Sequence, residues 1–174
     1  ALSQHGRRPA LRRPMQFALL TGSVIWLVGS IALSARPDTG QELPELSFAS
    51  LDGQMVPLAQ FKGQPTVVNL WATWCPPCVR EMPALRQAQI DYPGVNFVFV
   101  NQRESVDRVD AWLKARKLPL RNMLLDVNGQ TGAAFKQRAL PMTLFFDAKG
   151  RLVSTRIGEL SPATLTERLA EIRQ

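Results

Sequence analysis

The feature that most limits how this chain can fold is a closely spaced pair, Cys75 and Cys78, the only cysteines among its 174 residues. The residues before them, 66–71, are mostly β-branched and apolar and predict a buried strand. Two prolines separate the cysteines, and proline is tolerated in the first turn of a helix because the N–H groups there have no intrahelical partner. The sequence therefore predicts a strand, a short turn and a helix over residues 76–92, with Cys75 at the junction.

The cysteine inventory narrows the kinds of site that are possible. A disulfide-stabilised scaffold needs several cysteines spread along the chain, and a closed zinc site needs about four ligands. The only histidine, His5, lies in a basic N-terminal arm. A purely structural disulfide across so small a loop would constrain the unfolded chain little. Thiol–disulfide exchange is the favoured interpretation, and binding or delivery of Cu(I) by the two thiolates is the alternative.

The expected position of Cys75 at the start of a helix predicts that it is the reactive thiol. Free N–H groups and the positive end of the helix dipole favour thiolate over thiol, which lowers the pKa of the cysteine. Pro77 has no N–H to offer, whereas the N–H of Cys78 remains, so we expect a moderate lowering. Cys78 lies one helical turn further along, and we expect it to be more buried and to resolve the mixed disulfide.

The N-terminal part of the chain has the pattern of an exported, membrane-anchored protein. Residues 14–35 carry no charged side chain and would span roughly 33 Å as a helix, close to the ~30 Å hydrocarbon core of a bilayer. Four arginines precede this run and one follows it, which places the N-terminus in the cytoplasm. We expect a basic arm (1–14), a transmembrane anchor (15–35), a linker (36–45) and a folded domain (46–174). A cleaved signal peptide and a twin-arginine signal remain alternatives, and both would export the same domain.

The charge of the chain does not indicate nucleic-acid binding, although the formal net charge is +7. Residues 1–36 hold five arginines and no acid, which leaves 16 basic against 14 acidic side chains in the remainder. The excess charge therefore belongs to the membrane-flanking segments, and we expect no nucleic-acid partner.

The hydrophobic pattern of the remaining chain predicts one α/β domain. Apolar runs bounded by turn residues predict strands over 46–48, 55–58, 66–71, 95–100, 123–125, 142–146 and 152–157. Helical spacing predicts helices over 76–92, 105–117 and 131–138, and Ser161 with Pro162 opens a final helix. A parallel strand pair joined by a crossover helix, followed by an antiparallel hairpin, predicts a mixed sheet with helices on both faces.

Three segments together resemble the TlpA/ResA-like branch of the thioredoxin superfamily. They are the run Val-Asn-Leu-Trp-Ala-Thr-Trp-Cys-Pro-Pro-Cys at 68–78 followed by Glu-Met-Pro at 81–83, Leu-Pro-Met-Thr at 140–143, and the turn at 147–151. The resemblance covers about residues 43–174. It implies a thioredoxin-like fold and a location outside the cytoplasm, often with a membrane tether.

The resemblance also implies site residues beyond the cysteines. It implies that Pro141 is cis and packs beside the cysteine pair, and that the backbone of Leu140 pairs with a substrate peptide. It further implies that Glu81, one turn after Cys78, shuttles a proton to or from that thiol. The other interpretation of Glu81 is a surface residue paired with a neighbouring arginine, Arg80 or Arg86.

Three positions near the cysteines complete the expected site. Trp74 and Pro76 flank Cys75 and are expected to contact substrates. Asn69 stands where cytoplasmic thioredoxins place an aspartate, so that buried proton carrier is absent from this chain.

These observations predict a single-pass inner-membrane protein whose catalytic domain faces the periplasm and reduces disulfides in protein substrates. Such a reductant needs a membrane thiol electron donor, because no cytoplasmic reductase reaches that side. We expect no cofactor and no resident metal. With no dimerisation segment recognisable in the sequence, we expect a monomer.

Overall fold

The structure, a computed structural model, describes residues 40–174. The basic arm and the transmembrane anchor, predicted for residues 1–35, lie outside the described residues. Within the described part, no helix is both long and apolar enough to cross a membrane. The elements in chain order are β1 (Ser47–Ser50), β2 (Met55–Pro57), the 3-10 helix η1 (Leu58–Phe61), β3 (Thr66–Trp71), α2 (Pro76–Asp91), β4 (Asn96–Gln102), α3 (Val106–Ala115), β5 (Met123–Asp126), α4 (Gln130–Ala134), β6 (Met142–Phe146), β7 (Leu152–Ile157) and α5 (Pro162–Ile172).

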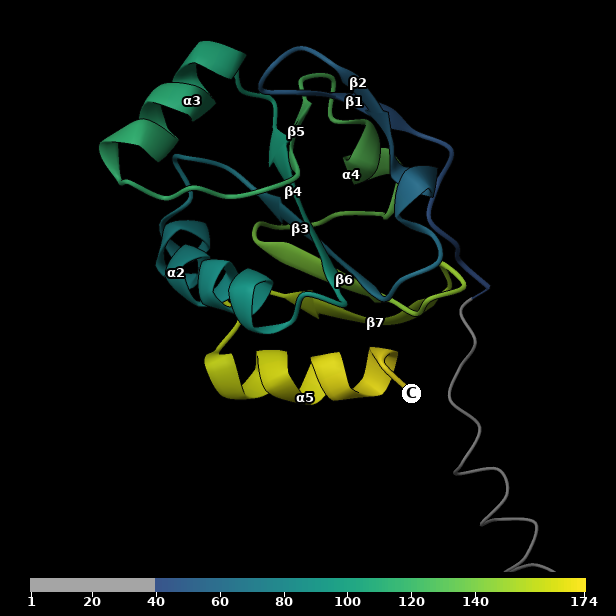
Figure 1. Cartoon of the computed structure of the whole chain (residues 1–174). Helices are drawn as coiled ribbons and strands as arrows, with labels where there is room; N and C mark the ends of the chain where they lie inside the picture. The colour runs from purple at the N-terminus through teal and green to yellow at the C-terminus, as the bar shows by residue number, and fades with distance from the viewer. Residues whose placement is uncertain (1–39) are drawn as a thin grey trace, which may run out of the picture. The chain divides into compact units, whose positions relative to one another are not determined.

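A single mixed sheet of seven strands forms the centre of the fold, in the order β2-β1-β5-β4-β3-β6-β7 (Figure 1). Strand β4 runs parallel to both β3 and β5, whereas β6 runs antiparallel to β3 and forms a hairpin with β7. Strand β1 pairs antiparallel with β5 and forms a second hairpin with β2. The mixed sheet and the element order expected from the sequence are confirmed.

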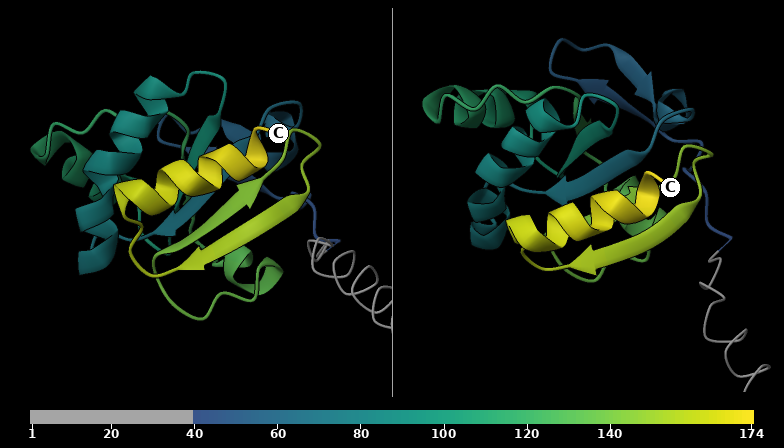
Figure 2. Two further views of the ribbon diagram at one scale, coloured as in Figure 1. Left: turned by 90° about the horizontal axis from the view of Figure 1, so that it is seen from below. Right: turned by 60° about the horizontal axis from the view of Figure 1, so that its bottom comes forward.

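The two faces of the sheet bury two separate cores, because successive side chains of a strand point to opposite faces. On one face, Val67 and Phe97 pack with apolar residues of α2, α3 and α5. On the other face, Val68 and Val98 pack with η1 and with Phe135, which follows α4. Figure 2 shows α5 lying along the β6–β7 hairpin. Helices therefore cover both faces, as predicted.

Two elements differ from the expected pattern. The helix predicted over 131–138 is the shorter α4, because Lys136 adopts a left-handed backbone (φ 51°) that ends it. This turn lets Phe135 lie with its ring centroid 6.0 Å from that of Phe146 in the second core. Leu58, expected to end a strand, instead begins η1 and is fully buried there.

Residues 41–43, which the sequence indicated as linker, contact the β6–β7 hairpin. Leu43 donates its N–H to Gly150 at 2.9 Å, and Leu152 donates to Gln41 at 2.8 Å. The side chain of Leu43 is buried in the second core. This short segment therefore packs as part of the domain.

One edge of the sheet collects the loops that carry the expected site. The parallel strands β3, β4 and β5 all end there, and the antiparallel strand β6 begins there. The loop after β3 leads to Cys75, and the residue before β6 is Pro141. Because Leu70 pairs with Met142, the register brings Pro141 beside the end of β3.

Candidate active site

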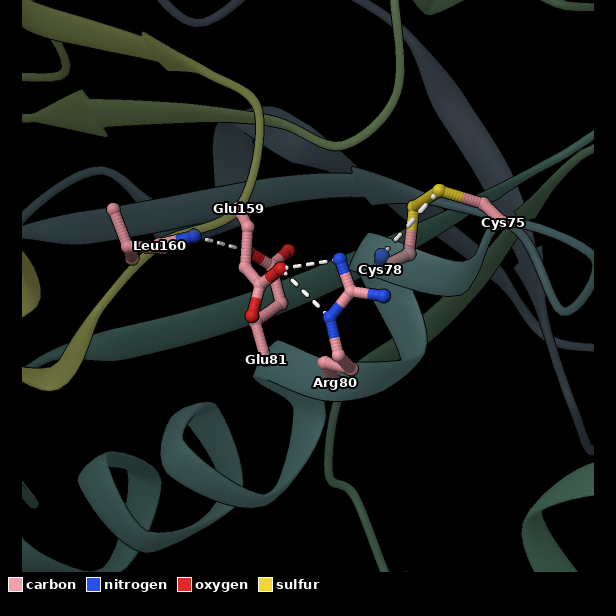
Figure 3. A network of polar contacts seen from close by, with 6 residues as sticks. All are labelled: Cys75, Cys78, Arg80, Glu81, Glu159 and Leu160. Carbon is pink, nitrogen blue, oxygen red and sulfur yellow. Dashed lines mark hydrogen bonds and ion pairs between the residues drawn. A yellow bond between two sulfur atoms is a disulfide. The ribbon is translucent and has the colours of Figure 1, made fainter.

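Cys75 and Cys78 are joined by a disulfide at the start of α2, with sulfurs 2.09 Å apart (Figure 3). Cys75 is the N-cap residue of the helix, and the N–H of Cys78 points to its sulfur at 3.4 Å. This is the donor that the sequence indicated would remain after Pro77. Both residues are buried, Cys78 completely and Cys75 to within 3% exposure. The structure thus has an oxidised pair whose first sulfur faces the N-terminal end of a helix.

The carboxyl group of Glu81 is buried one helical turn beyond this pair. Its side chain projects from α2 one turn after Cys78, and the residue is only 2% exposed. One oxygen accepts a 2.8 Å hydrogen bond from the amide of Asn69, and the other accepts one of 2.8 Å from the N–H of Leu160. Burial raises the pKa of Glu81 to about 7, although both hydrogen bonds oppose the rise. A group with this pKa can both give up and accept a proton near neutral pH.

The interpretation of Glu81 as a surface residue paired with arginine is wrong. Arg80 binds Glu159 instead, with its Nη2 2.6 Å from the carboxylate, and both side chains are partly exposed. Figure 3 shows the outer pair lying next to the inner contact between Glu81 and Leu160. Two adjacent residues of α2 thus hold two adjacent residues of the loop before α5.

The amide of Asn69 connects Glu81 to the neighbouring strand. Its nitrogen donates both to Glu81 and, at 3.0 Å, to the hydroxyl of Thr143 on β6. Its oxygen is buried and has no hydrogen-bond partner among the described residues. Rotation of the amide by half a turn would present that oxygen to a protonated Glu81, so the site holds an acceptor for the neutral carboxyl as well as donors for the charged one.

The four residues expected to contact substrates come from two segments, one at the start of α2 and one directly before β6. Trp74 and Pro76 are exposed on either side of Cys75 in the sequence, and Trp74 is 62% exposed. The peptide bond between Leu140 and Pro141 is cis, as the resemblance implied. Leu140 is half-buried and packs against the core cluster that contains both cysteines. Trp74 and Leu140 also line one shared pocket, so the two loops adjoin.

A second buried carboxylate, Glu104, was missed by the sequence analysis. It follows β4 and accepts hydrogen bonds from Thr73, through the backbone N–H at 2.7 Å and the hydroxyl at 2.5 Å. The amide of Asn101 donates to it at 2.8 Å, and Arg108 forms an ion pair with it at 2.9 Å. Glu104 therefore anchors the turn that leads into Trp74 and Cys75. In the sequence, the only sign of this anchoring role is the position of Glu104 shortly after a buried strand.

Within residues 40–174, no group of three or more His, Cys, Asp and Glu side chains is arranged to hold a metal ion. Met142, the sulfur-bearing residue after Pro141, is buried in the core on the second face of the sheet.

A two-cysteine disulfide at a helix start, next to a cis-proline loop on a thioredoxin-like sheet, defines the class of thiol–disulfide oxidoreductases. Comparison with family models matches residues 39–155 to the AhpC/TSA family, and the chain belongs to that family. The resemblance to ResA-like thiol–disulfide oxidoreductases is confirmed by the relatives, and the chain is an enzyme of this kind.

Three similar proteins illustrate the match. The thioredoxin-like protein YneN of Bacillus subtilis is 30% identical over 75% of this chain and 78% of its own length. The thiol–disulfide oxidoreductase ResA of Bacillus cereus is 26% identical over 93% of this chain and 95% of its own. The solved structure of MTB dsbF superimposes with a TM-score of 0.67 at 28% identity, covering 74% of this chain and 96% of the other.

Proposed function

We propose that this chain is a membrane-anchored reductant that faces the periplasm and reduces disulfides in protein substrates. The observation that carries the proposal is the position of the Cys75–Cys78 disulfide, with Cys75 as the N-cap of α2 and a buried carboxyl one turn beyond Cys78. The helix start stabilises a Cys75 thiolate, and the carboxyl group exchanges a proton with the Cys78 thiol.

The reaction starts from the reduced pair. The Cys75 thiolate attacks one sulfur of the substrate disulfide, which forms a mixed disulfide and releases the other substrate sulfur as a thiolate. The Cys78 thiolate then attacks the Cys75 sulfur, which releases the second substrate sulfur. The substrate gains two electrons and two protons, and the enzyme is left with the Cys75–Cys78 disulfide seen in the structure. A membrane thiol donor restores the reduced pair by the reverse exchange.

Glu81 is the proton carrier for Cys78 in this scheme. Cys78 is fully buried, so its proton has no direct route to water. The carboxylate of Glu81 takes that proton when Cys78 attacks, and returns one when the disulfide is reduced. Burial supports this role because it raises the pKa of Glu81 to about 7, within reach of neutral pH.

Two exposed side chains and the backbone of the cis-proline loop form the substrate contact. Trp74 and Pro76 offer apolar surface on one side of Cys75. Leu140 and Pro141 offer the backbone of the cis-proline loop on the other side, with which an extended peptide pairs.

The anchor and the direction of exchange have separate support. The uncharged run at residues 14–35, with four arginines before it, supports insertion with the domain outside the cytoplasm. A domain on that side needs electrons from a membrane thiol donor. The reduction potential of the cysteine pair tests the direction, since a value near −270 mV indicates a reductant and one near −120 mV an oxidant.

The central experiment follows a protein disulfide mixed with the reduced full chain in neutral detergent micelles. Reduction should require Cys75, so Cys75→Ser should be inactive, whereas Cys78→Ser should accumulate a mixed disulfide with the substrate. Equal activity of wild type and Cys75→Ser would disprove the exchange role. Labelling of the cysteines by a membrane-impermeant thiol reagent in spheroplasts, together with carbonate extraction of the membranes, tests location and anchoring.

A further inference from the structure

A pocket of about 480 Å³ is lined by Trp74, the residue directly before Cys75. It is also lined by Leu140, by the end of β4, and by α4 with the residues that follow it. Trp74 directly precedes Cys75 and Leu140 directly precedes Pro141, so a polypeptide whose cysteine is joined to Cys75 would continue across this opening. The volume lies within the ~300–1,000 Å³ range of ordinary ligand sites.

The side chains that line the pocket carry a net positive charge. Arg103 and Arg138 both line it, and no acidic side chain does. Neither arginine has an ion-pair partner among residues 40–174, whereas Arg80 and Arg151, which lie elsewhere on the surface, are each paired with an acid. Arginine remains charged at every physiological pH.

Two acids that adjoin Arg103, Glu104 in the sequence and Asp126 through a backbone hydrogen bond, are already occupied. Glu104 follows Arg103, but its carboxylate binds Thr73, Asn101 and Arg108. Asp126, at the end of β5, is buried and accepts hydrogen bonds from the first residues of α4. Neither carboxylate neutralises the pocket.

The side chain of Arg103 is held at the pocket by the local backbone. Its backbone is left-handed (φ 60°), and its N–H donates to the backbone carbonyl of Asp126 at 3.0 Å. Its guanidinium lies over Gly129, where a Cβ atom would come within 2.5 Å of Nε. Glycine at 129 therefore leaves the space in which the guanidinium lies.

We propose that this pocket binds the polypeptide segment next to the substrate cysteine, and that Arg103 and Arg138 make it selective for segments that carry Asp or Glu. The inference rests on the proposed reduction of protein disulfides and adds the class of substrate. A guanidinium binds a carboxylate through two parallel hydrogen bonds, which gives both affinity and orientation. The exposed ring of Trp74 supplies the apolar contact that anchors such a segment.

The test uses three matched peptide disulfides that differ only in the two residues beside the cysteine, Glu-Glu, Gln-Gln or Lys-Lys. With the reduced full chain in neutral detergent micelles at 50 mM salt, kcat/KM should fall in that order, by at least about fivefold between the first and the last. The preference should shrink at 500 mM salt, because screening weakens pairs between exposed charges. Equal kcat/KM for all three peptides would overturn the inference.

Variants connect the preference to the two arginines. The double variant Arg103→Gln/Arg138→Gln should lose the preference, and Arg103→Glu/Arg138→Glu should favour the Lys-Lys peptide. The control Arg173→Gln removes an arginine at the far end of α5, outside the pocket, and should keep the wild-type ratio. A preference that survives in the double glutamine variant would also overturn the inference.

The same data separate this inference from the proposed function. Failure of the wild type to reduce any of the peptides, to the same level as Cys75→Ser, would contradict the exchange role itself. Reduction of all three peptides at one rate would leave the exchange role intact and remove only the charge selectivity.

Discussion

The N–H of Leu160 donates a 2.8 Å hydrogen bond to Glu81, across 79 positions of sequence. This contact joins the reactive helix α2 to the loop before α5. It gives a hydrogen-bond donor to one oxygen of a carboxyl group that is almost completely buried. The other oxygen is held by Asn69 from β3. Glu81 therefore lies where three separate segments meet, and its proton affinity depends on all of them.

Replacing Glu81 by glutamine should remove one ionisation from the pH dependence of the rate of disulfide exchange. In the wild type, the rate of resolution by Cys78 should change around the Glu81 pKa of about 7. Glu81→Gln should lose that limb of the pH profile and react on the order of 10²-fold more slowly at neutral pH. Stopped-flow measurement between pH 5 and 9 checks this, with Glu167→Gln on the exposed face of α5 as control. An unchanged rate and profile would exclude the proton-carrier role.

The stability of the oxidised protein should depend on the same group. Folding raises the pKa of Glu81 from 4.5 to about 7, so the folded state holds the proton more tightly than the unfolded chain. The stabilising contribution is fully present below pH 4.5 and is lost as pH rises through 7, by about 3 kcal/mol. Urea unfolding of wild type and Glu81→Gln at pH 4.5 and 8 measures the difference. A pH-independent difference between the two would contradict the buried, proton-binding carboxyl.

The exposed pair between Arg80 and Glu159 should tune the proton affinity of Glu81. The negative charge of Glu159 raises the pKa of Glu81, and Arg80 neutralises that charge at 2.6 Å. Glu159→Gln should therefore lower the midpoint of the pH profile, and Arg80→Gln should raise it. The double variant should behave like Glu159→Gln, because Arg80 acts through Glu159. Shifts of the same sign in both single variants would refute this coupling.

Loss of the Glu104 carboxylate should loosen the turn before Cys75. Glu104→Ala leaves the N–H of Thr73 and the amide of Asn101 without their acceptor in a buried place. We expect a loss of about 3 kcal/mol in the free energy of unfolding. Asp110→Asn, which breaks the exposed i,i+4 pair with Lys114, should cost less than about 1 kcal/mol and serves as control. Equal losses in the two variants would show that Glu104 is no anchor.

Much of the fold could be predicted because its signals are local. The strand 66–71 and the final helix opened by Ser161 follow from side-chain periodicity and from capping within a few residues. One exception is α4, which ends early where the packing of Phe135 requires a turn that its own sequence does not specify. Helix ends depend on tertiary contacts more than helix centres do.

The sequence by itself determined the reactive pair: the spacing of Cys75 and Cys78, their place at the start of a helix, and a carboxyl one turn later. These relationships are set by covalent neighbours and by the 3.6-residue period. Only the tertiary structure decided which groups surround them. It brought Leu160 to Glu81 over 79 positions, Glu104 to Thr73 over 31, and Arg103 and Arg138 to one pocket. Those partners come from loops that meet at one edge of the sheet, and the strand order that joins them is a property of the whole fold.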